Sequence, residues 1–201
     1  MASNCTRNRS FLALAALWLS VAPAAAGQKA EVQRLFQSGA YEQAAEAARD
    51  GDPASTYVAA QALIKAERND RAAAEFARLR AGGDAAWQLV GESGEALVAG
   101  DAGRAVELAR KATEADGNNA FAQYQLGLAA SRANDWGAAE GAFARTIQLK
   151  PDFAYAHYYK ALVHQRLRQL PKSAEHFEAF LRLAPDAPER SAVLAIMKTL
   201  K

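Results

Sequence analysis

The sequence predicts an all-α protein in which antiparallel helix pairs stack into a solenoid. Three consecutive segments that begin at Ala86, Ala120 and Ala154 align without a gap, at a spacing of 34 residues. Apolar residues within them recur at intervals of three and four, as on one face of a helix. No segment alternates apolar and polar residues as a half-buried strand does. A 34-residue period indicates a helix–turn–helix unit that buries its apolar face only against its neighbours.

The segment over residues 120–153 shows each element of this unit. Its first helix contains Gly127, which is small enough for a second helix to approach closely. Asp135 follows a break and is expected to cap the second helix, because its carboxylate can accept from the unpaired amides of the first turn. The apolar face of the second helix consists of Trp136, Ala139, Phe143 and Ile147. Pro151 ends the unit, since proline cannot continue a helix interior.

These residues resemble the tetratricopeptide repeat family, whose pattern runs W-x2-L-G-x2-Y, then A-x3-F, then P. Residues 120–153 match it through Leu126-Gly127, Ala139-x3-Phe143 and Pro151. Residues 154–186 match it through Ala161, Ser173-x3-Phe177 and Pro185, and residues 86–119 match it through Ser93 and Ala105-x3-Ala109. The resemblance implies a right-handed superhelix of about five units that binds other proteins along its concave face.

The repeat pattern weakens toward the N-terminus and gives way to a predicted cap at the C-terminus. Residues 27–85 are expected to form two degenerate helix pairs, and the register of the second pair is open between Ala72-x3-Phe76 and Ala74-x3-Arg78. Residues 187–201 are expected to form a capping helix, because Asp186-Ala187-Pro188-Glu189 has the residues of a helix start. Its apolar stripe would cover the last unit and consists of Val193, Ile196, Met197 and Leu200.

Residues 1–26 have the order of a secretory signal peptide. Arg7 and Arg9 precede an apolar run over residues 11–22, and small residues follow at Ala24 and Ala26. We expect cleavage after Ala26, with Ala24 as the alternative, and a periplasmic or secreted protein without a membrane span. An uncleaved membrane anchor is a second alternative, although the run is shorter than the roughly 20 residues of a full span.

Removal of the signal peptide leaves a chain without formal net charge. Residues 1–26 hold two of the 24 Lys and Arg residues and none of the 22 acidic residues. A neutral chain lacks the broad positive surface of a nucleic-acid-binding protein, so we expect no nucleic-acid partner. The single cysteine, Cys5, also lies in the signal peptide, so packing without disulfides must hold the remaining chain together.

The sequence offers no convincing catalytic or metal-binding motif. His157 and His164 share a helix face but occupy the Trp and Tyr positions of the repeat pattern, which indicates packing residues. No cysteine or close set of carboxylates completes a metal-ligand shell. Ser93 has no glycine two residues after it, so it does not form a G-x-S-x-G nucleophile elbow. We therefore expect no enzyme activity, no cofactor and no metal.

The resemblance implies that a protein or peptide partner binds to first-helix residues on the concave face. These residues include aromatic rings and arginines, which are the types that anchor protein partners. The predicted groove is lined by Trp87, Val90, Leu97, Phe121, Tyr124, Leu128, Arg132, Tyr155, Tyr158, Leu162, Gln165 and Arg166. Packing against a neighbouring helix is an open alternative for Phe121 and Tyr155, whereas we expect Tyr124 and Tyr158 to be free for a partner.

These features together predict a non-catalytic scaffold of the cell envelope that holds a partner peptide or helix in its groove. Three other functions stay open: an accessory subunit that positions a partner enzyme or assembly complex, a self-associating structural protein, and an envelope hydrolase. Resemblance at the level of the fold does not choose among them, because function depends on the site.

Overall fold

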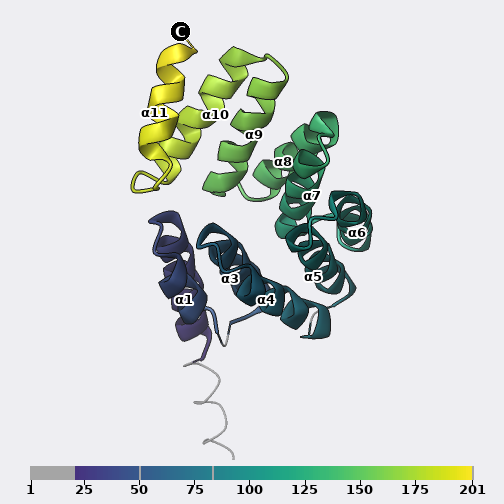
Figure 1. Ribbon diagram of the computed structural model, residues 1–201. Helices are drawn as coiled ribbons and strands as arrows, with labels where there is room; N and C mark the ends of the chain where they lie inside the picture. The colour runs from purple at the N-terminus through teal and green to yellow at the C-terminus, as the bar shows by residue number, and fades with distance from the viewer. Residues whose placement is uncertain (1–20, 50, 83, 201) are drawn as a thin grey trace, which may run out of the picture.

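The computed structural model describes residues 21–49, 51–82 and 84–200, with side chains from Gly27 onward. Within these residues the chain forms eleven helices and no strand, and short turns connect the helices (Figure 1). The helices are α1 (Val21–Gln37), α2 (Tyr41–Ala47), α3 (Pro53–Lys65), α4 (Asn69–Gly82), α5 (Ala85–Val98), α6 (Ala102–Ala115), α7 (Ala120–Arg132), α8 (Trp136–Leu149), α9 (Ala154–Arg166), α10 (Leu170–Leu183) and α11 (Arg190–Thr199).

Successive helices pack as hairpins, and each hairpin is one repeat unit. The five hairpins are α1/α2, α3/α4, α5/α6, α7/α8 and α9/α10, and α11 packs on α10. The odd-numbered helices also contact one another, α1 with α3, α5 with α7, and α7 with α9. These contacts place the odd-numbered helices in the inner layer of a curved solenoid (Figure 1). The predicted fold class is confirmed.

Burial identifies the register of the second hairpin, which the sequence left open. Ala72 and Phe76 are completely buried, whereas Ala74 and Arg78 are more exposed. A helix that packs on its hairpin partner must direct its apolar face inward. The repeat register is therefore Ala72-x3-Phe76.

Small residues and capping aspartates set the geometry of the hairpins. A Cβ added at Gly127 would lie 2.5 Å from Phe143 Cε1, so only glycine lets α7 and α8 approach this closely. Gly94 faces the ring of Phe76 in the same manner, between successive units. The predicted cap of α8 is confirmed, since the Asp135 carboxylate accepts from the Ala138 amide. Asp84 caps α5 through the Trp87 amide.

The two ends of the superhelix meet on one side of the molecule. Lys65, the last residue of α3, places its Nζ 2.5 Å from Glu189 Oε1 in the turn before α11. The Tyr155 hydroxyl of α9 donates to Glu189 Oε2 at 2.8 Å. The Pro188 ring lies against Gly39, in the turn between α1 and α2. We call Gly39, Lys65, Tyr155, Pro188 and Glu189 the closing contact.

The capping helix begins at Arg190, and not at residue 187 as the sequence predicted. Glu189 directly precedes this helix, but its carboxylate binds Lys65 and Tyr155 and makes no capping hydrogen bond. The apolar stripe nevertheless faces the last unit, because Val193 is buried and Ile196 and Met197 pack against the core. The predicted signal peptide falls largely on residues 1–20, which lie outside the described residues.

Candidate functional site

Aromatic rings fill the concave side of the superhelix. The ring of Phe121 lies 5.6 Å from those of Tyr57, Trp87 and Phe153. Tyr124 stacks on Phe153 with 4.6 Å between ring centroids. We call this set of rings the aromatic cluster; it comprises Tyr57, Trp87, Phe121, Tyr124, Phe153, Tyr155, Tyr158 and Tyr159. The cluster occupies space that an open solenoid would leave for a partner.

A buried chain of hydrogen bonds supports the aromatic cluster. The Tyr57 hydroxyl donates to Gln125 Oε1 at 2.8 Å, and Gln125 Nε2 donates to Ser93 Oγ at 3.1 Å. Ser93 Oγ in turn donates to the Ala105 carbonyl at 2.9 Å. Because the Ser93 hydroxyl is committed to a backbone carbonyl and faces an amide, it has no base to activate it. Ser93 therefore has a structural role: its hydrogen bonds link α5 to α6 and α7.

Half of the predicted groove residues belong to this filled interior. Val90, Tyr124 and Tyr155 are at most 2% exposed, so they are not available to a partner in this conformation. The expectation that the Tyr124 ring is free is wrong, because Phe153, just before α9, stacks on it. The Tyr155 ring packs on the ring of Phe36, with 4.9 Å between ring centroids. Of the two roles that the sequence left open for Tyr155, packing against a neighbouring helix is the one observed. Three further predicted residues are half-buried in the cluster: Trp87, Phe121 and Tyr158.

The other six predicted residues line two adjoining pockets at the C-terminal ends of the inner helices. One pocket, of about 340 Å³, lies among α3, α5, α7 and α9, and the other, of about 430 Å³, lies among α7, α8 and α9. Ser131 and Tyr159 line both pockets, so the two pockets adjoin at these residues. We call this the rim groove; its predicted lining residues are Leu97, Leu128, Arg132, Leu162, Gln165 and Arg166.

Sequence reasoning missed several residues of the rim groove. They are Gln61, Ile64, Asn69, Val98, Gly100, Trp136, Tyr159 and Val163. Val98 could have been found, because it aligns with Arg132 and Arg166 at the 34-residue spacing. Gln61 is a polar residue inside an alanine-rich apolar stretch of α3, which is also a visible sign. Ile64 and Asn69 belong to a unit whose register the sequence did not fix.

Gln61 carries an unsatisfied hydrogen-bond donor. The residue is 9% exposed, and its Nε2 atom is inaccessible to solvent and has no hydrogen-bond partner among the described residues. The Gln61 amide lies near the Tyr57 hydroxyl, whose pKa is raised by burial and is lowered in part by this amide. The two groups form no hydrogen bond, because the Tyr57 hydroxyl donates to Gln125 and Gln61 Nε2 has no partner. A buried unpaired donor costs about 1–3 kcal/mol, so this amide lowers the stability of the fold.

Two exposed arginines give the rim groove its charge. Arg132 and Arg166 form no ion pair with any carboxylate of the described residues. The Arg166 guanidinium lies 5.7 Å from the ring centre of Trp136, so an aromatic side chain supports it. Burial raises the pKa of the Tyr159 hydroxyl, and the Arg132 charge opposes this effect. The rim groove therefore combines apolar side chains, such as those of Leu128 and Leu162, with the positive charges of Arg132 and Arg166.

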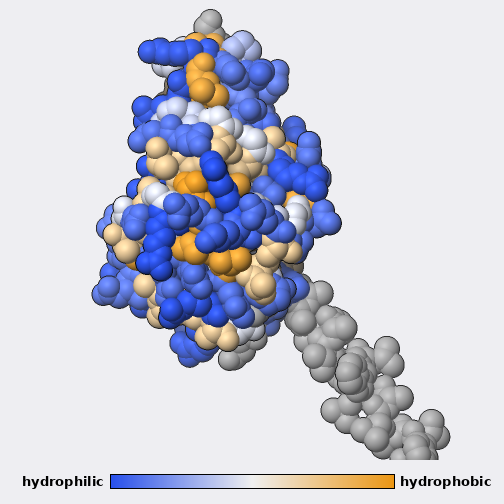
Figure 2. Space-filling model, turned by 90° about the vertical axis from the view of Figure 1, so that its right-hand side faces the viewer, coloured by the Kyte–Doolittle hydropathy of each residue, from blue (hydrophilic) through white to orange (hydrophobic). Residues whose placement is uncertain are grey.

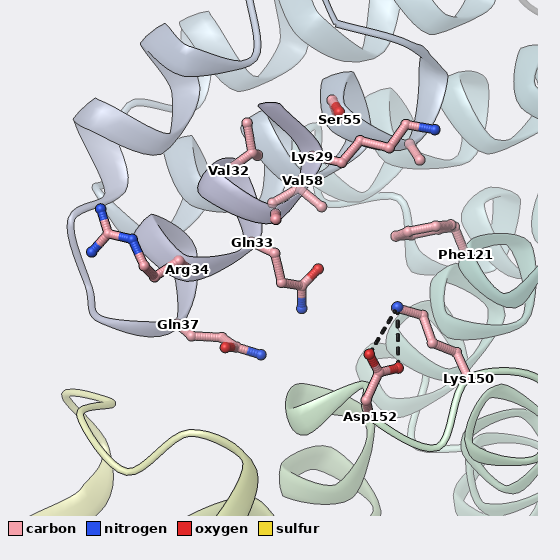
Figure 3. Close-up of a pocket in the computed structure, with 12 residues that line it drawn as sticks. Lys29, Val32, Gln33, Arg34, Gln37, Ser55, Val58, Phe121, Lys150 and Asp152 are labelled. Carbon is pink, nitrogen blue, oxygen red and sulfur yellow. Dashed lines mark hydrogen bonds and ion pairs between the residues drawn. The ribbon is translucent and has the colours of Figure 1, made fainter. Parts of the chain in front are cut away.

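A third pocket, of about 480 Å³, lies at the opposite ends of the inner helices. Side chains of α1 and α3, among them Val32 and Val58, face Phe121 and the Lys150–Asp152 pair across it (Figure 3). Its charges are largely neutralised, since Lys150 lies 3.1 Å from Asp152, and Lys29 lies 2.7 Å from Asp52. Phe121 is the one predicted groove residue that lines it.

The three histidines form a packed cluster between α9 and α10. His164 is 1% exposed and stacks parallel to His176 at 5.4 Å, and His157 Nδ1 lies 3.1 Å from His176 Nδ1. Burial lowers the pKa of all three, to about 4 for His176. Among the described residues, no group of three or more His, Cys, Asp or Glu side chains has the arrangement of a metal site.

The outer surface seen from the side of α5 to α8 is mainly hydrophilic, with separate hydrophobic patches and no broad apolar face (Figure 2). None of the helices in the described part of the chain has the length and hydropathy needed to cross a membrane.

Helix hairpins stacked in this way define an α-helical repeat protein. No protein-family model and no curated protein matches the sequence. Solved structures do match, and tetratricopeptide repeat domains, which are generally non-catalytic interaction modules, are prominent among them. The chain has the tetratricopeptide repeat fold.

Three of these structures match different shares of the chain. YrrB, a TPR protein with an unusual peptide-binding site, is 20% identical, and the match covers 86% of each chain with a TM-score of 0.53. The TPR2AB domain of yeast Sti1, in complex with pHSP90, is 13% identical and covers 83% of this chain and 81% of its own, with a TM-score of 0.54. The first TPR of Spaghetti (RPAP3), bound to the HSP90 peptide SRMEEVD, is 18% identical, covers 58% and 90%, and has a TM-score of 0.54.

Proposed function

We propose that this protein is a non-catalytic scaffold that holds an extended segment of a partner protein in the rim groove. The observation that carries the proposal is that two pockets adjoin at Ser131 and Tyr159, along the C-terminal ends of the inner helices. Leu97, Leu128 and Leu162 offer apolar surface along this path, which an extended segment could bury. The peptides bound by Spaghetti and Sti1 support a binding role for a scaffold of this fold.

The rim groove is a better site than the centre of the concave face. A segment in the centre would have to displace the aromatic cluster and separate the closing contact. The rim groove needs no such rearrangement, since its pockets exist in the closed conformation. Binding without rearrangement avoids the free-energy cost of populating a minor state.

The proposal includes an extracytoplasmic location, with a role in an envelope assembly or secretion complex. The order of charged, apolar and small residues in residues 1–26 supports export. Cleavage after Ala26 would leave intact the part of α1 that packs into the core, because Val32, Leu35 and Phe36 all follow it. A fusion of residues 1–26 to a reporter enzyme that is active only outside the cytoplasm tests this location.

The binding role is tested by site-specific photo-crosslinking in cells of the source organism. A photoreactive amino acid at Ser131, where the two pockets join, should capture a defined partner. The same group at Lys111, which is exposed on α6 and lies outside the groove, is the matched control. Equal capture at both positions would place the partner elsewhere. Capture of a second copy of the chain at Ser131 would favour self-association.

A further inference from the structure

The histidines between α9 and α10 are joined by hydrogen bonds with a defined direction. Burial lowers the pKa of His157 and His176, so both rings are neutral at pH 7 and each carries one N–H group. The Pro151 carbonyl can only accept, so the proton of His157 is on Nε2, 3.3 Å from that oxygen. His157 Nδ1 is then an acceptor, and His176 Nδ1 donates to it at 3.1 Å.

His164 extends this cluster into the interior of the hairpin. It is 1% exposed, and its ring is parallel to that of His176, with 5.4 Å between ring centroids. Its Nδ1 donates to Gln169 Oε1, at the start of α10, over 2.9 Å. Because His157 and His164 belong to α9 and His176 belongs to α10, the cluster holds the two helices of the last hairpin together.

The charged side chains around the histidine cluster are mainly positive. Those that act on the rings from α8, α9 and α10 are Glu140, Lys160, Lys172 and Arg182. The Glu140 carboxylate lies 4.0 Å from Lys160 Nζ, so this cation already shares it. A further positive charge on a ring therefore enters a site that is positive and partly removed from water, which disfavours it.

Protonation disturbs the cluster in two steps. A first proton on His176 Nε2 keeps the hydrogen bond to His157 but places a charge against the buried ring of His164. A proton on His157 Nδ1 leaves two N–H donors facing each other across 3.1 Å, so the hydrogen bond between α9 and α10 is lost. The rings titrate as a coupled group, and each added proton opposes the packing of α9 on α10.

We propose that the histidine cluster is a pH-sensitive switch that opens the last hairpin, by separating α9 from α10, in mildly acidic surroundings. This hairpin lies at the end of the repeat array and is followed only by α11, so fewer contacts oppose its opening than in a central unit (Figure 1). Opening would disturb the closing contact through Tyr155 and the rim groove through Leu162 and Arg166. The effect on the groove rests on the proposed function, whereas the switch is a property of the hairpin itself.

The size of the effect can be worked out for His176. Its pKa is about 4 in the closed hairpin and returns to the ordinary 6.5 where the ring meets water. The equilibrium constant for opening therefore rises roughly tenfold between pH 7.5 and pH 5.5 through this ring alone. His157 and His164 add to the rise, since burial lowers the pKa of each of them.

Amide hydrogen exchange followed by mass spectrometry tests the switch on the purified full chain without a partner. After correction for the intrinsic exchange rate, peptides from α9 and α10 should lose roughly tenfold in protection between pH 7.5 and pH 5.5. Peptides from α5 and α6 should keep theirs. A loss spread evenly over all helices would overturn the proposal, because it would report unfolding of the whole chain.

Two variants separate titration from weakened packing. His157→Gln/His176→Asn replaces the facing rings with amides that offer donors and acceptors but do not titrate in this range, so it should lose roughly threefold less protection than the native chain on acidification. Ser173→Ala is the matched control, because it removes a hydrogen bond from α10 to the Ala161 carbonyl of α9 and should lower protection equally at both pH values. A full tenfold loss in the histidine variant would overturn the switch.

Proton NMR of the native chain gives a second reading that does not depend on any variant. The ring signals of the three histidines should shift with pH at values below the ordinary 6.5, with His176 the lowest. Three rings that titrate independently near 6.5 would contradict a closed cluster and overturn the proposal. Neither measurement involves the rim groove, so failure of the switch would leave the proposed binding role untouched.

Discussion

Gly39 and Gly100 form a natural pair for testing whether the superhelix is closed. Both have a left-handed backbone, with φ of 81° and 83°, and each follows the first helix of its hairpin. A Cβ at Gly100 would meet open space, whereas a Cβ at Gly39 would collide with the Pro188 ring of the closing contact. Gly39→Ala and Gly100→Ala therefore share the same backbone strain and differ in one long-range contact.

The expected losses follow from these two effects. An alanine in the left-handed region costs about 1–2 kcal/mol, and this is the whole loss expected for Gly100→Ala. Gly39→Ala adds the cost of displacing Pro188, which we place at about 1–3 kcal/mol by comparison with overpacked cores. For a chain of this size each kcal/mol shifts the Tm by roughly 2–4 °C. Gly39→Ala should therefore melt several degrees below Gly100→Ala.

Thermal unfolding followed by circular dichroism measures the difference. The double variant Gly39→Ala/Pro188→Ala removes the colliding ring and should recover the added loss, leaving only the backbone strain. Small-angle scattering should show a larger radius of gyration for Gly39→Ala if the collision opens the superhelix. Equal Tm values for Gly39→Ala and Gly100→Ala would refute the closed arrangement.

Three other variants test the interior of the repeat array. The pKa values of the three histidines in the folded chain lie below the ordinary 6.5, so their contribution to stability is complete above pH 6.5 and is lost as pH falls toward about 4. After allowance for solvent screening we expect this pH-dependent loss of stability to be about 1–2 kcal/mol. The variant His176→Phe should make the loss smaller. Gly127→Ala should cost about 1–3 kcal/mol in urea unfolding, because the new methyl group meets the Phe143 ring. Gln61→Leu should leave stability unchanged or raise it by about 1 kcal/mol, since it removes an unsatisfied donor, and a clear loss would show that the amide has a partner.

The local architecture could be predicted from the sequence because each hairpin is encoded within one repeat. Gly127, Asp135 and Phe143 lie within a stretch of 17 residues. Gly127 packs against Phe143, and Asp135 caps the helix that carries Phe143, so all of these contacts lie within one hairpin. The degenerate N-terminal units were harder to predict, since Ala72 and Ala74 are equally small and only burial distinguishes them.

The candidate site could be predicted only in part, because it depends on how the units curve. The repeat pattern assigns Tyr124 and Leu128 to one concave face and contains nothing that separates them. In the structure, Tyr124 is covered by Phe153, while Leu128 lines the rim groove. The difference arises from contacts between units and across the superhelix, which a 34-residue period does not specify.

The closing contact changes how the repeat array should unfold. In an open solenoid each unit contacts only its neighbours, so distant units are energetically independent. Here Lys65 and Glu189 are separated by 124 positions in the sequence but are joined at 2.5 Å, with side chains only 18% and 17% exposed. Burial alone would raise the pKa of Glu189, but Lys65 and Tyr155 lower it below its ordinary value. The stability from this carboxylate is therefore present above pH 4.5 and is lost as pH falls through the lowered pKa.

A double-mutant cycle with Lys65→Met and Glu189→Gln measures this coupling. Each single variant leaves a charged or polar group without its partner in a largely buried site, so each should lose about 2–4 kcal/mol. The double variant should lose clearly less than the sum, because both groups are removed together, with a coupling of about 1–3 kcal/mol. Gly100→Ala combined with either single variant is the control and should be additive within about 0.5 kcal/mol. If the stability losses of Lys65→Met and Glu189→Gln were also additive, the two ends of the superhelix would be energetically independent. That result would contradict the closed superhelix and would favour an open one whose central groove is free.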